Sequence, residues 1–458
     1  MNWLRKFFSG KSQEVTSAFE APPALQALPA YQPLAVLTPP PPTVRKSASS
    51  SALPSFQTPG NELGFGFAGP DNSRNKVRDA FSPSLPITDP RLLAGRTEAL
   101  QTLIRAIEDL KLHVVIYGER GIGKTSLLQI LKQLAEQAKY QVVYHSCGED
   151  ARFPDMFRAI AGEIPLLYHQ GFDIAGGGDA RRSGSLASLL PAGDFNVSQL
   201  SDTFAQLSNT RVLIMLDEFD RSPPGLFRRN IAQLVKNLSD RSVKVQLVIA
   251  GVAGNLADLV EHIPSIRRNI LGFRVPELQP SEVQQMVSIG EEISGLIFDP
   301  QASADIVSMS NGSPYLASLL SQYASFGALD REAAIVTPVD VRKAVAQVAD
   351  ELRARLSEAT GEAADRAIAD GWRATLHMLA NRSMHQMGCL DPDQLEDIFT
   401  DRGFPEVAEQ LREAYGLVIA VPEEKAGRYR FREEGLGSYL WLHLADDEIG
   451  AVAEKEGA

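Results

Sequence analysis

The chain has 458 residues, and at about 100 to 200 residues per domain this length predicts two to four domains. Hydrophobic residues at 44% and charged residues at 22% exclude a disordered or fibrous protein, because most of the chain can bury a core. The net charge of -12 argues against a surface built throughout to bind nucleic-acid phosphates. The 2 cysteines are too few for a disulfide framework, and they favour a cytoplasmic location.

Residues 1–84 are predicted to be a disordered, proline-rich arm. Ten of the 28 prolines precede residue 60, and no helical or strand period follows until about residue 80. The longest uncharged stretch, residues 21–44, contains too many prolines for a membrane helix. No transmembrane segment is therefore predicted.

Residues 85–279 alternate between apolar runs and helical periods, a pattern typical of a parallel sheet with helices on both faces. Five apolar runs are predicted to be its buried strands: residues 112–117, 141–145, 212–216, 245–250 and 273–275. A stretch rich in Gly and Ser, residues 176–188, is predicted to be a loop insertion between the second and third strands. We therefore expect an α/β domain over this part of the chain.

After Pro280 the strand signals stop, and residues 280–349 are predicted to form a small helical domain. Residues 350–448 begin with a long helix and continue with shorter elements. These are two helices and then two strands: residues 391–399, 405–415, 417–421 and 429–431. Three helices followed by a hairpin predict a winged-helix-like domain, and residues 449–458 are predicted to be a flexible tail.

The strongest motif begins at the end of the first predicted strand and matches G-x-x-x-x-G-K-[ST]. It is predicted to bind a nucleotide through Gly118, Glu119, Arg120, Gly121, Ile122, Gly123, Lys124, Thr125 and Ser126. Backbone N–H groups and the N-terminus of the following helix would surround the phosphates, and Lys124 would reach the β and γ oxygens. Thr125 would hold Mg²⁺. We call residues 118–125 the phosphate loop.

Two acids follow the third predicted strand, at the sheet edge where ligands of such folds bind. Asp217 is the expected Mg²⁺ ligand, and Glu218 stands where a carboxylate could polarise a water for attack on the γ-phosphate. The alternative for Glu218 is a solvated acid at a strand end.

Together the phosphate loop and these acids resemble the P-loop ATPases of the AAA+ and STAND groups, in the branch that includes replication initiators and archaeal-type ATPases. The resemblance implies ATP and Mg²⁺ as cofactors and a helical lid over residues 280–349. Residues 93–98 are similar to the family segment near the adenine, which implies nucleotide contacts by Gly95 and Arg96. Residues 310–315 resemble the Gly-x-Pro lid of STAND ATPases, which favours a switch.

The resemblance also implies an arginine finger, which acts in the family across a subunit boundary. Arg267 and Arg268 stand just before the fifth predicted strand, at the corresponding place. The alternative is two exposed arginines on a helix. The predicted fold class is α/β, a P-loop parallel sheet core with a helical lid and a C-terminal winged-helix-like domain.

The winged-helix-like domain gives conflicting signals about DNA. Its candidate recognition helix carries Glu406, Glu409 and Glu413, which would repel phosphates. Basic residues gather around the predicted hairpin: Lys425, Arg428, Arg430 and Arg432. Protein interaction or internal packing is favoured, and duplex DNA contact through the basic hairpin is the alternative.

These patterns predict a Mg²⁺-dependent ATPase, which converts ATP and water to ADP and phosphate and acts as a nucleotide-dependent conformational switch or assembly platform. A protein partner or self-association is expected. Two alternatives stay open: an ATP-dependent DNA-binding initiator or loader, and an ATP-binding scaffold with little hydrolysis.

Overall fold

The computed structural model describes residues 72–170, 184–208, 210–253, 256, 268–385, 388–395, 399, 403–421 and 428–445. Most of the predicted arm, most of the Gly-rich insertion and the predicted tail lie outside the described residues. Arg267 and Lys425 also lie outside them. Among the described residues, no helix combines the length and the apolar composition needed to cross a bilayer.

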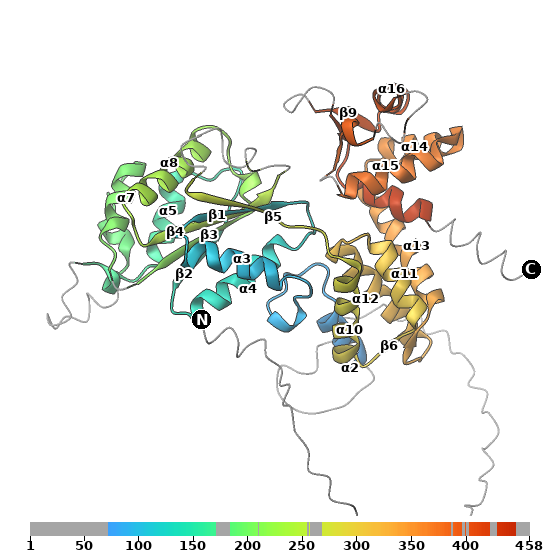
Figure 1. Cartoon of the computed structure of the whole chain (residues 1–458), viewed down its shortest axis with the longest axis horizontal. Helices are drawn as coiled ribbons and strands as arrows, with labels where there is room; N and C mark the ends of the chain where they lie inside the picture. The colour runs from blue at the N-terminus through green and yellow to red at the C-terminus, as the bar shows by residue number, and fades with distance from the viewer. Residues whose placement is uncertain are drawn as a thin grey trace, which may run out of the picture. The chain divides into compact units, whose positions relative to one another are not determined.

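A five-stranded parallel sheet forms the centre of the core (Figure 1). Its strands are β1 (His113–Gly118), β2 (Gln141–Ser146), β3 (Val212–Asp217), β4 (Val245–Val252) and β5 (Ile270–Arg274), in the order β2-β3-β4-β1-β5. The predicted fold class is confirmed. The fifth strand begins at Ile270 and not at residue 273, because Ile270 already pairs with His113 of β1. Gly272 interrupts the apolar run of this strand, so the sequence pattern did not indicate its first half.

Helices cover both faces of this sheet, and the alternation of strand residues divides the buried side chains between them. One face packs against α3 (Thr97–Glu108) and α4 (Lys124–Gln137) through Val114 and Ile116 of β1. The other face packs against α5 (Phe153–Gly162), α7 (Val197–Ala205) and α8 (Leu226–Asp240). All residues of β3 are buried, as expected for an interior strand of a sheet that is covered on both faces.

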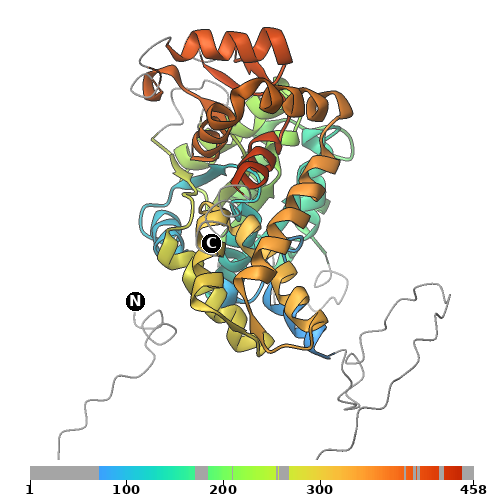
Figure 2. The ribbon, with the colours of Figure 1, turned by 90° about the vertical axis from the view of Figure 1, so that its right-hand side faces the viewer.

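The lid consists of four helices that follow the core and of one helix that precedes it. The four are α10 (Pro280–Ser294), α11 (Pro300–Ser310), α12 (Pro314–Asp330) and α13 (Pro338–Arg355), and they lie side by side in Figure 2. Each begins with proline in its first turn, where the missing N–H leaves no hydrogen bond unmade. Two short parallel strands, β6 (Ile297–Phe298) and β7 (Ile335–Val336), pair with each other within the lid.

The preceding helix is α2 (Asn72–Ala80), which lies within the stretch predicted to be a disordered arm. It is mostly polar, and Val77 is the one large apolar residue within it. Val77 and Phe81 are nevertheless buried in the hydrophobic core of the lid. The ring of Phe81 lies over Gly290, where an added Cβ would be 2.0 Å from a ring atom, and its centroid is 5.9 Å from that of Phe298.

Truncating Val77 should destabilise the chain, because its side chain is fully buried between α2 and the lid helices. For Val77→Ala we expect the free energy of unfolding to fall by about 2 kcal/mol, from two lost methyl groups and a small cavity. Urea denaturation measures this. The control is Lys76→Ala, an exposed neighbour on the same helix, which should change stability by less than about 0.5 kcal/mol. Equal midpoints for both variants would contradict the docking of α2.

The C-terminal region begins with α14 (Glu358–Ala367), a π-helical turn (Ile368–Trp372) and α15 (Arg373–His385). It continues with α16 (Phe404–Gln410), a second π-helical turn (Leu411–Tyr415) and a helix over residues 436–445. Its antiparallel sheet has the order β8-β10-β9, formed by Cys389–Leu390, Tyr429–Phe431 and Val418–Ala420. Together the helices and the sheet form the winged-helix-like domain that was predicted.

Two further details concern the helices of this region. The helix predicted at 391–399 begins with a 3-10 turn, Pro392–Gln394, in which Asp391 accepts from Asp393 N, and residues 396–398 lie outside the described residues. The helix over residues 436–445 was not predicted. Its Trp441 is buried and donates through Nε1 to the carbonyl of Met309 in the lid at 2.8 Å. The lid and the C-terminal region accordingly share one hydrophobic core.

Candidate functional site

The phosphate loop connects the end of β1 to the start of α4. Gly121 and Gly123 have φ of 77° and 94°, a region that residues with a Cβ rarely adopt. An added Cβ at Gly123 would meet nothing within 4 Å, so the loop is open on that side. The residues predicted from Gly118 to Ser126 thus lie together in one loop and the helix start that follows it. The hydroxyl of Ser126 also accepts a hydrogen bond from Ile87 N at 3.0 Å, which holds the segment that leads into the core.

Lys124 is the first residue of α4, and its side chain is buried. Its Nζ donates to the carbonyls of Gly118 at 3.0 Å and Glu119 at 2.7 Å. Burial lowers the pKa of Lys124 to about 8, although the nearby carboxylates of Asp220 and Asp217 act in the opposite direction. Anionic phosphates beside Nζ would favour its charged form again. The lysine is therefore held against the loop, where a phosphate could replace its carbonyl partners.

The two predicted acids lie at the carboxyl end of β3, on the same edge of the sheet as the phosphate loop. Asp217 is buried; its Oδ2 accepts from the hydroxyl of Tyr144 at 2.7 Å and its Oδ1 from Glu218 N at 2.9 Å. Burial and the neighbouring Asp217 carboxylate raise the pKa of Tyr144, so its phenol stays a donor. Thr125, the other predicted Mg²⁺ ligand, lies in the first turn of α4 at this edge.

Glu218 has a left-handed backbone, with φ of 51°, and turns its side chain toward β2. Its Oε2 accepts from Ser146 Oγ at 3.0 Å and from Arg221 Nη1 at 3.2 Å. The following Asp220 accepts through Oδ1 from Val252 N at 2.8 Å, which ties the turn to the end of β4. Tyr144 and Ser146 were not predicted, because only the order of the strands places β2 beside the acids.

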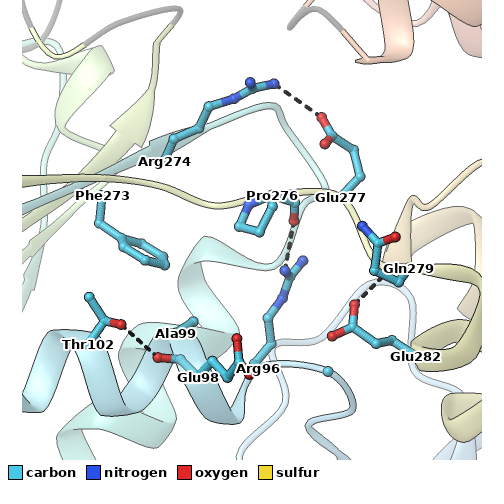
Figure 3. Close-up of a pocket in the computed structure, with 11 residues that line it drawn as sticks. Arg96, Glu98, Ala99, Thr102, Phe273, Arg274, Pro276, Glu277, Gln279 and Glu282 are labelled. Atoms are coloured by element: carbon cyan, nitrogen blue, oxygen red, sulfur yellow. Dashed lines mark hydrogen bonds and ion pairs between the residues drawn. The ribbon is translucent and has the colours of Figure 1, made fainter.

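Arg96 is buried and holds three segments together (Figure 3). Its guanidinium donates to the carbonyl of Pro276 at 2.7 Å and to that of Ile122 at 3.1 Å. Burial lowers the pKa of Arg96, and the carboxylates of Glu282 and Glu277 oppose this shift. Figure 3 shows the dashed contact to Pro276, in the connection from β5 to the lid. Arg96 thus braces the phosphate loop against this connection, and a nucleotide contact by Arg96 stays a prediction.

Arg96 and Gly95 also line a pocket of about 340 Å³ between α3, the end of β5 and the start of α10. The other lining residues are Glu98, Ala99, Thr102, Phe273, Arg274, Pro276, Glu277, Gln279 and Glu282. Gly95 has φ of 67°, and an added Cβ would lie 2.5 Å from the carboxyl carbon of Glu282. The predicted adenine-side residues therefore lie where the core approaches the lid.

The lid contacts the phosphate loop through Tyr315, at the start of α12. An added Cβ at Gly121 would lie 3.0 Å from the Cβ of Tyr315. The hydroxyl of Tyr315 accepts from Arg355 Nη1 at 2.9 Å, at the end of α13. Arg355 was not predicted, because 40 residues separate it from its partner.

The C-terminal region also contacts the phosphate loop. Arg120 Nη1 lies 2.9 Å from Glu434 Oε2, and the two side chains are 75% and 63% exposed. The preceding Glu433 accepts from Ser357 N at 2.9 Å and also from the hydroxyl of Thr360, at the start of α14. A second contact joins Arg274 Nη2 of β5 to the carbonyl of His385 at 3.3 Å.

Arg268 does not lie with the rest of the predicted site. It is exposed and stands two residues before Ile270, which pairs with His113 at the start of β1. The amino ends of parallel strands share one sheet edge, and the phosphate loop follows their carboxyl ends. Arg268 therefore lies at the edge opposite to Lys124 of the same chain.

The predicted basic hairpin is only partly a free basic surface. Arg430 and Arg432 are exposed, whereas Arg428 forms an ion pair with Asp391 at 2.9 Å. On the candidate recognition helix, Arg412 forms ion pairs with Glu409 and Glu413. The positive charge available for phosphates is thereby reduced.

Residues 92–249 match the family described as AAA ATPase domain. No curated protein sequence matches the chain. Among solved structures, Cdc6p from Pyrobaculum aerophilum is similar at 18% identity, with 81% of this chain and 98% of that chain covered and a TM-score of 0.41. A Walker-type ATPase of Pyrococcus abyssi has 14% identity, 78% and 98% coverage and a TM-score of 0.46. The ORC1 protein of Aeropyrum pernix, solved in complex with DNA, has 15% identity, 83% and 98% coverage and a TM-score of 0.41.

Proposed function

Because residues 92–249 are an AAA ATPase domain, we propose that this chain binds and hydrolyses Mg·ATP and uses the nucleotide state to reposition the lid and C-terminal region against the core. The chain would be a nucleotide-dependent conformational switch. Its reaction would be ATP and water to ADP and phosphate.

The residues at the phosphate loop fit Mg·ATP. The loop is open at Gly123, its N–H groups stand at a helix N-terminus, and Lys124 adds a buried positive charge. Thr125 and Asp217 offer the oxygen ligands that Mg²⁺ prefers. When bound, the metal ion would neutralise charge on the β and γ oxygens.

The chain's own groups would then perform separate tasks. Lys124 would leave its carbonyl partners and hold the phosphates. Glu218 would orient the attacking water and accept its proton at a carboxylate oxygen. An arginine finger acting between subunits would come from Arg267 or Arg268. Because Arg268 lies at the opposite sheet edge of its own chain, it could complete a site only in a neighbouring copy.

The observation that carries the switch is the ion pair between Arg120 and Glu434. Arg120 belongs to the phosphate loop, so the charges of bound phosphates would attract its guanidinium and repel the Glu434 carboxylate. An exposed pair of this kind contributes about 1 kcal/mol or less. Nucleotide charge is therefore sufficient to break it.

The distribution of the hydrophobic clusters supports the same motion. In the part of the chain that the structure describes, no buried apolar cluster joins the core to the lid. The C-terminal region shares its cluster with the lid and would move with it. The connection at residues 275–279 is the natural hinge, since Val275 belongs to a core cluster and Leu278 to that of the lid.

Energy transfer between dyes on Lys139→Cys in the core and Glu406→Cys in the C-terminal region tests the proposal, in a Cys389→Ser background. ATP should change the transfer in the otherwise wild-type chain. Glu434→Gln should lower the ATP concentration at the midpoint of the change in energy transfer by up to about fivefold, because one competitor for Arg120 is removed. The matched control is Glu413→Gln, whose ion-pair partner Arg412 lies on the same helix turn.

Three other outcomes decide between functions. Hydrolysis without any change in transfer would contradict the switch. ATP binding without hydrolysis or change in transfer would favour the scaffold. The exposed Arg430 and Arg432 favour the DNA-dependent alternative, so duplex DNA is added at low salt. If DNA shifts the ATP concentration at the midpoint of the change in energy transfer, and Arg430→Gln removes this shift, the DNA-dependent alternative is the better conclusion.

A further inference from the structure

The small parallel sheet of the lid has an apolar outer face. Ile297 of β6 stands opposite Ile335 of β7, and the two residues are 60% and 50% exposed. The next pair, Phe298 and Val336, points to the other face and is buried in the core of the lid. Val339, in the first turn of α13, is 47% exposed and follows Ile335 closely in the chain. We call Ile297, Ile335 and Val339 the lid patch.

The lid patch differs from the other exposed apolar residues because its members lie together. Single exposed apolar residues are ordinary on a protein surface, whereas a group of them marks a contact. In the part of the chain that the structure describes, nine large apolar residues are exposed, and three of them form the lid patch. The other six are spread over residues 85–252. The lid patch therefore indicates a docking surface.

An added third strand does not suit this surface, because side chains already bond the outer edges of β6 and β7. The N–H of Phe298 donates to Glu291 Oε1 at 2.7 Å, and the N–H of Thr337 donates to Asp340 Oδ2 at 2.8 Å. The occupant therefore has to contribute apolar side chains to the outer face of the sheet.

The direction of α2 brings the preceding part of the chain to this end of the lid. The carbonyl of Phe81, just after α2, accepts from Gln322, whereas Arg74, near its start, forms an ion pair with Asp330 at the end of α12. The guanidinium of Arg74 also lies 5.3 Å from the ring centroid of Phe326. Helix α2 thus runs antiparallel to α12 and starts where α12 leads into β7. Figure 1 labels α2 and β6 at the same lower end of the lid.

The residues that precede α2 include three large apolar side chains in an alternating pattern. Leu63, Phe65 and Phe67 are separated by single glycines, so in an extended chain all three side chains project to one side. They lie outside the described residues. An extended chain from Phe67 to the start of α2 reaches about 16 Å. This is more than the length of α2 itself, about 14 Å, so the segment can reach the lid patch.

We propose that Leu63, Phe65 and Phe67 dock on the lid patch of their own chain. This inference does not rest on the proposed function, because it involves no nucleotide. The connection through α2 gives the segment an effective concentration of about millimolar or more, so a small contact suffices. A patch of three residues is too small for stable association between separate chains, which bury roughly 20 to 30 residues on each side. A segment of the same chain is therefore favoured over a second copy.

The first test is the reaction rate of a thiol at the edge of the lid patch. Val339→Cys is introduced into the full-length chain with Cys389→Ser and treated with a maleimide; the native Cys147 is buried. Replacing Phe65 and Phe67 together by serine should raise the rate constant about tenfold, because burial of one large apolar side chain already corresponds to such a factor. Equal rates with and without the two serines would overturn the proposal.

The matched control for this rate is a thiol at Leu226→Cys, an exposed apolar position in the core. Its rate should be the same with and without the serines at 65 and 67. A rise at Leu226→Cys as well would mean that the serines loosen the whole fold, and the proposal would then fail.

The second test identifies the occupant by cross-linking Phe67→Cys to Ile335→Cys with a short bismaleimide. A cross-link within one chain, independent of protein concentration, is the expected result, whereas Phe67→Cys with Leu226→Cys should give none. A cross-linked dimer would assign the lid patch to a second copy and overturn the proposal. Absence of any cross-link would overturn it as well, in favour of a different protein as the partner.

Discussion

Lys124→Ala should abolish the ATPase activity, with turnover falling at least about 100-fold, as when a group that stabilises transition-state charge is removed. The lysine is buried at the start of α4, where its Nζ contacts two carbonyls of the phosphate loop. Alanine would leave the γ-phosphate without this positive charge. Phosphate release measured at saturating ATP checks the expectation.

The control for this variant is Lys244→Ala. Lys244 is exposed and immediately precedes β4, at the amino edge of the sheet, so its loss should leave turnover unchanged. If Lys124→Ala retains the rate of the Lys244→Ala variant, the phosphate loop is not the site of hydrolysis.

Glu218→Gln should separate binding from chemistry. The amide keeps the size of the side chain and can still accept from Ser146, but it cannot accept the proton of the attacking water. Removing a general base typically lowers the rate by about 10² to 10⁴. We therefore expect unchanged ATP affinity and turnover reduced by that factor, measured by equilibrium binding and by phosphate release.

Glu163→Gln serves as the comparison for this charge removal, since Glu163 is an exposed acid at the end of α5. Both variants should bind ATP equally. Wild-type turnover in Glu218→Gln would mean that Glu218 is a solvated acid at a strand end and takes no part in hydrolysis.

The parts of the candidate site whose position in the fold follows from the sequence are local. The phosphate loop is contiguous, and its glycines, its preceding strand and its following helix are all within one short segment. Asp217 and Glu218 follow a run of buried residues, so the end of β3 predicts their position at the sheet edge. Both features need only a strand and the rule that parallel strands share their carboxyl edge.

The remaining features depend on contacts between distant segments. The Arg120–Glu434 pair joins residues 314 positions apart, and no periodicity indicates it. Tyr144 and Ser146 gain their partners from the strand order β2-β3. The helix α2 is mostly polar, and its buried side chains are Val77 and, just beyond its end, Phe81. Only the contacts with the lid in the structure show that these two side chains are buried.

The docking of α2 also has a consequence for synthesis on the ribosome. Because α2 ends at residue 80 and α10 begins at residue 280, its partner emerges 280 − 80 = 200 residues later. At roughly 5 to 20 residues per second, Val77 and Phe81 wait about 10 to 40 s before their binding surface exists. During that interval the sheet and its covering helices have time to fold, so the lid helices pack together after the core has formed. Until the lid helices have been synthesised, these two apolar side chains are therefore exposed to chaperones and proteases.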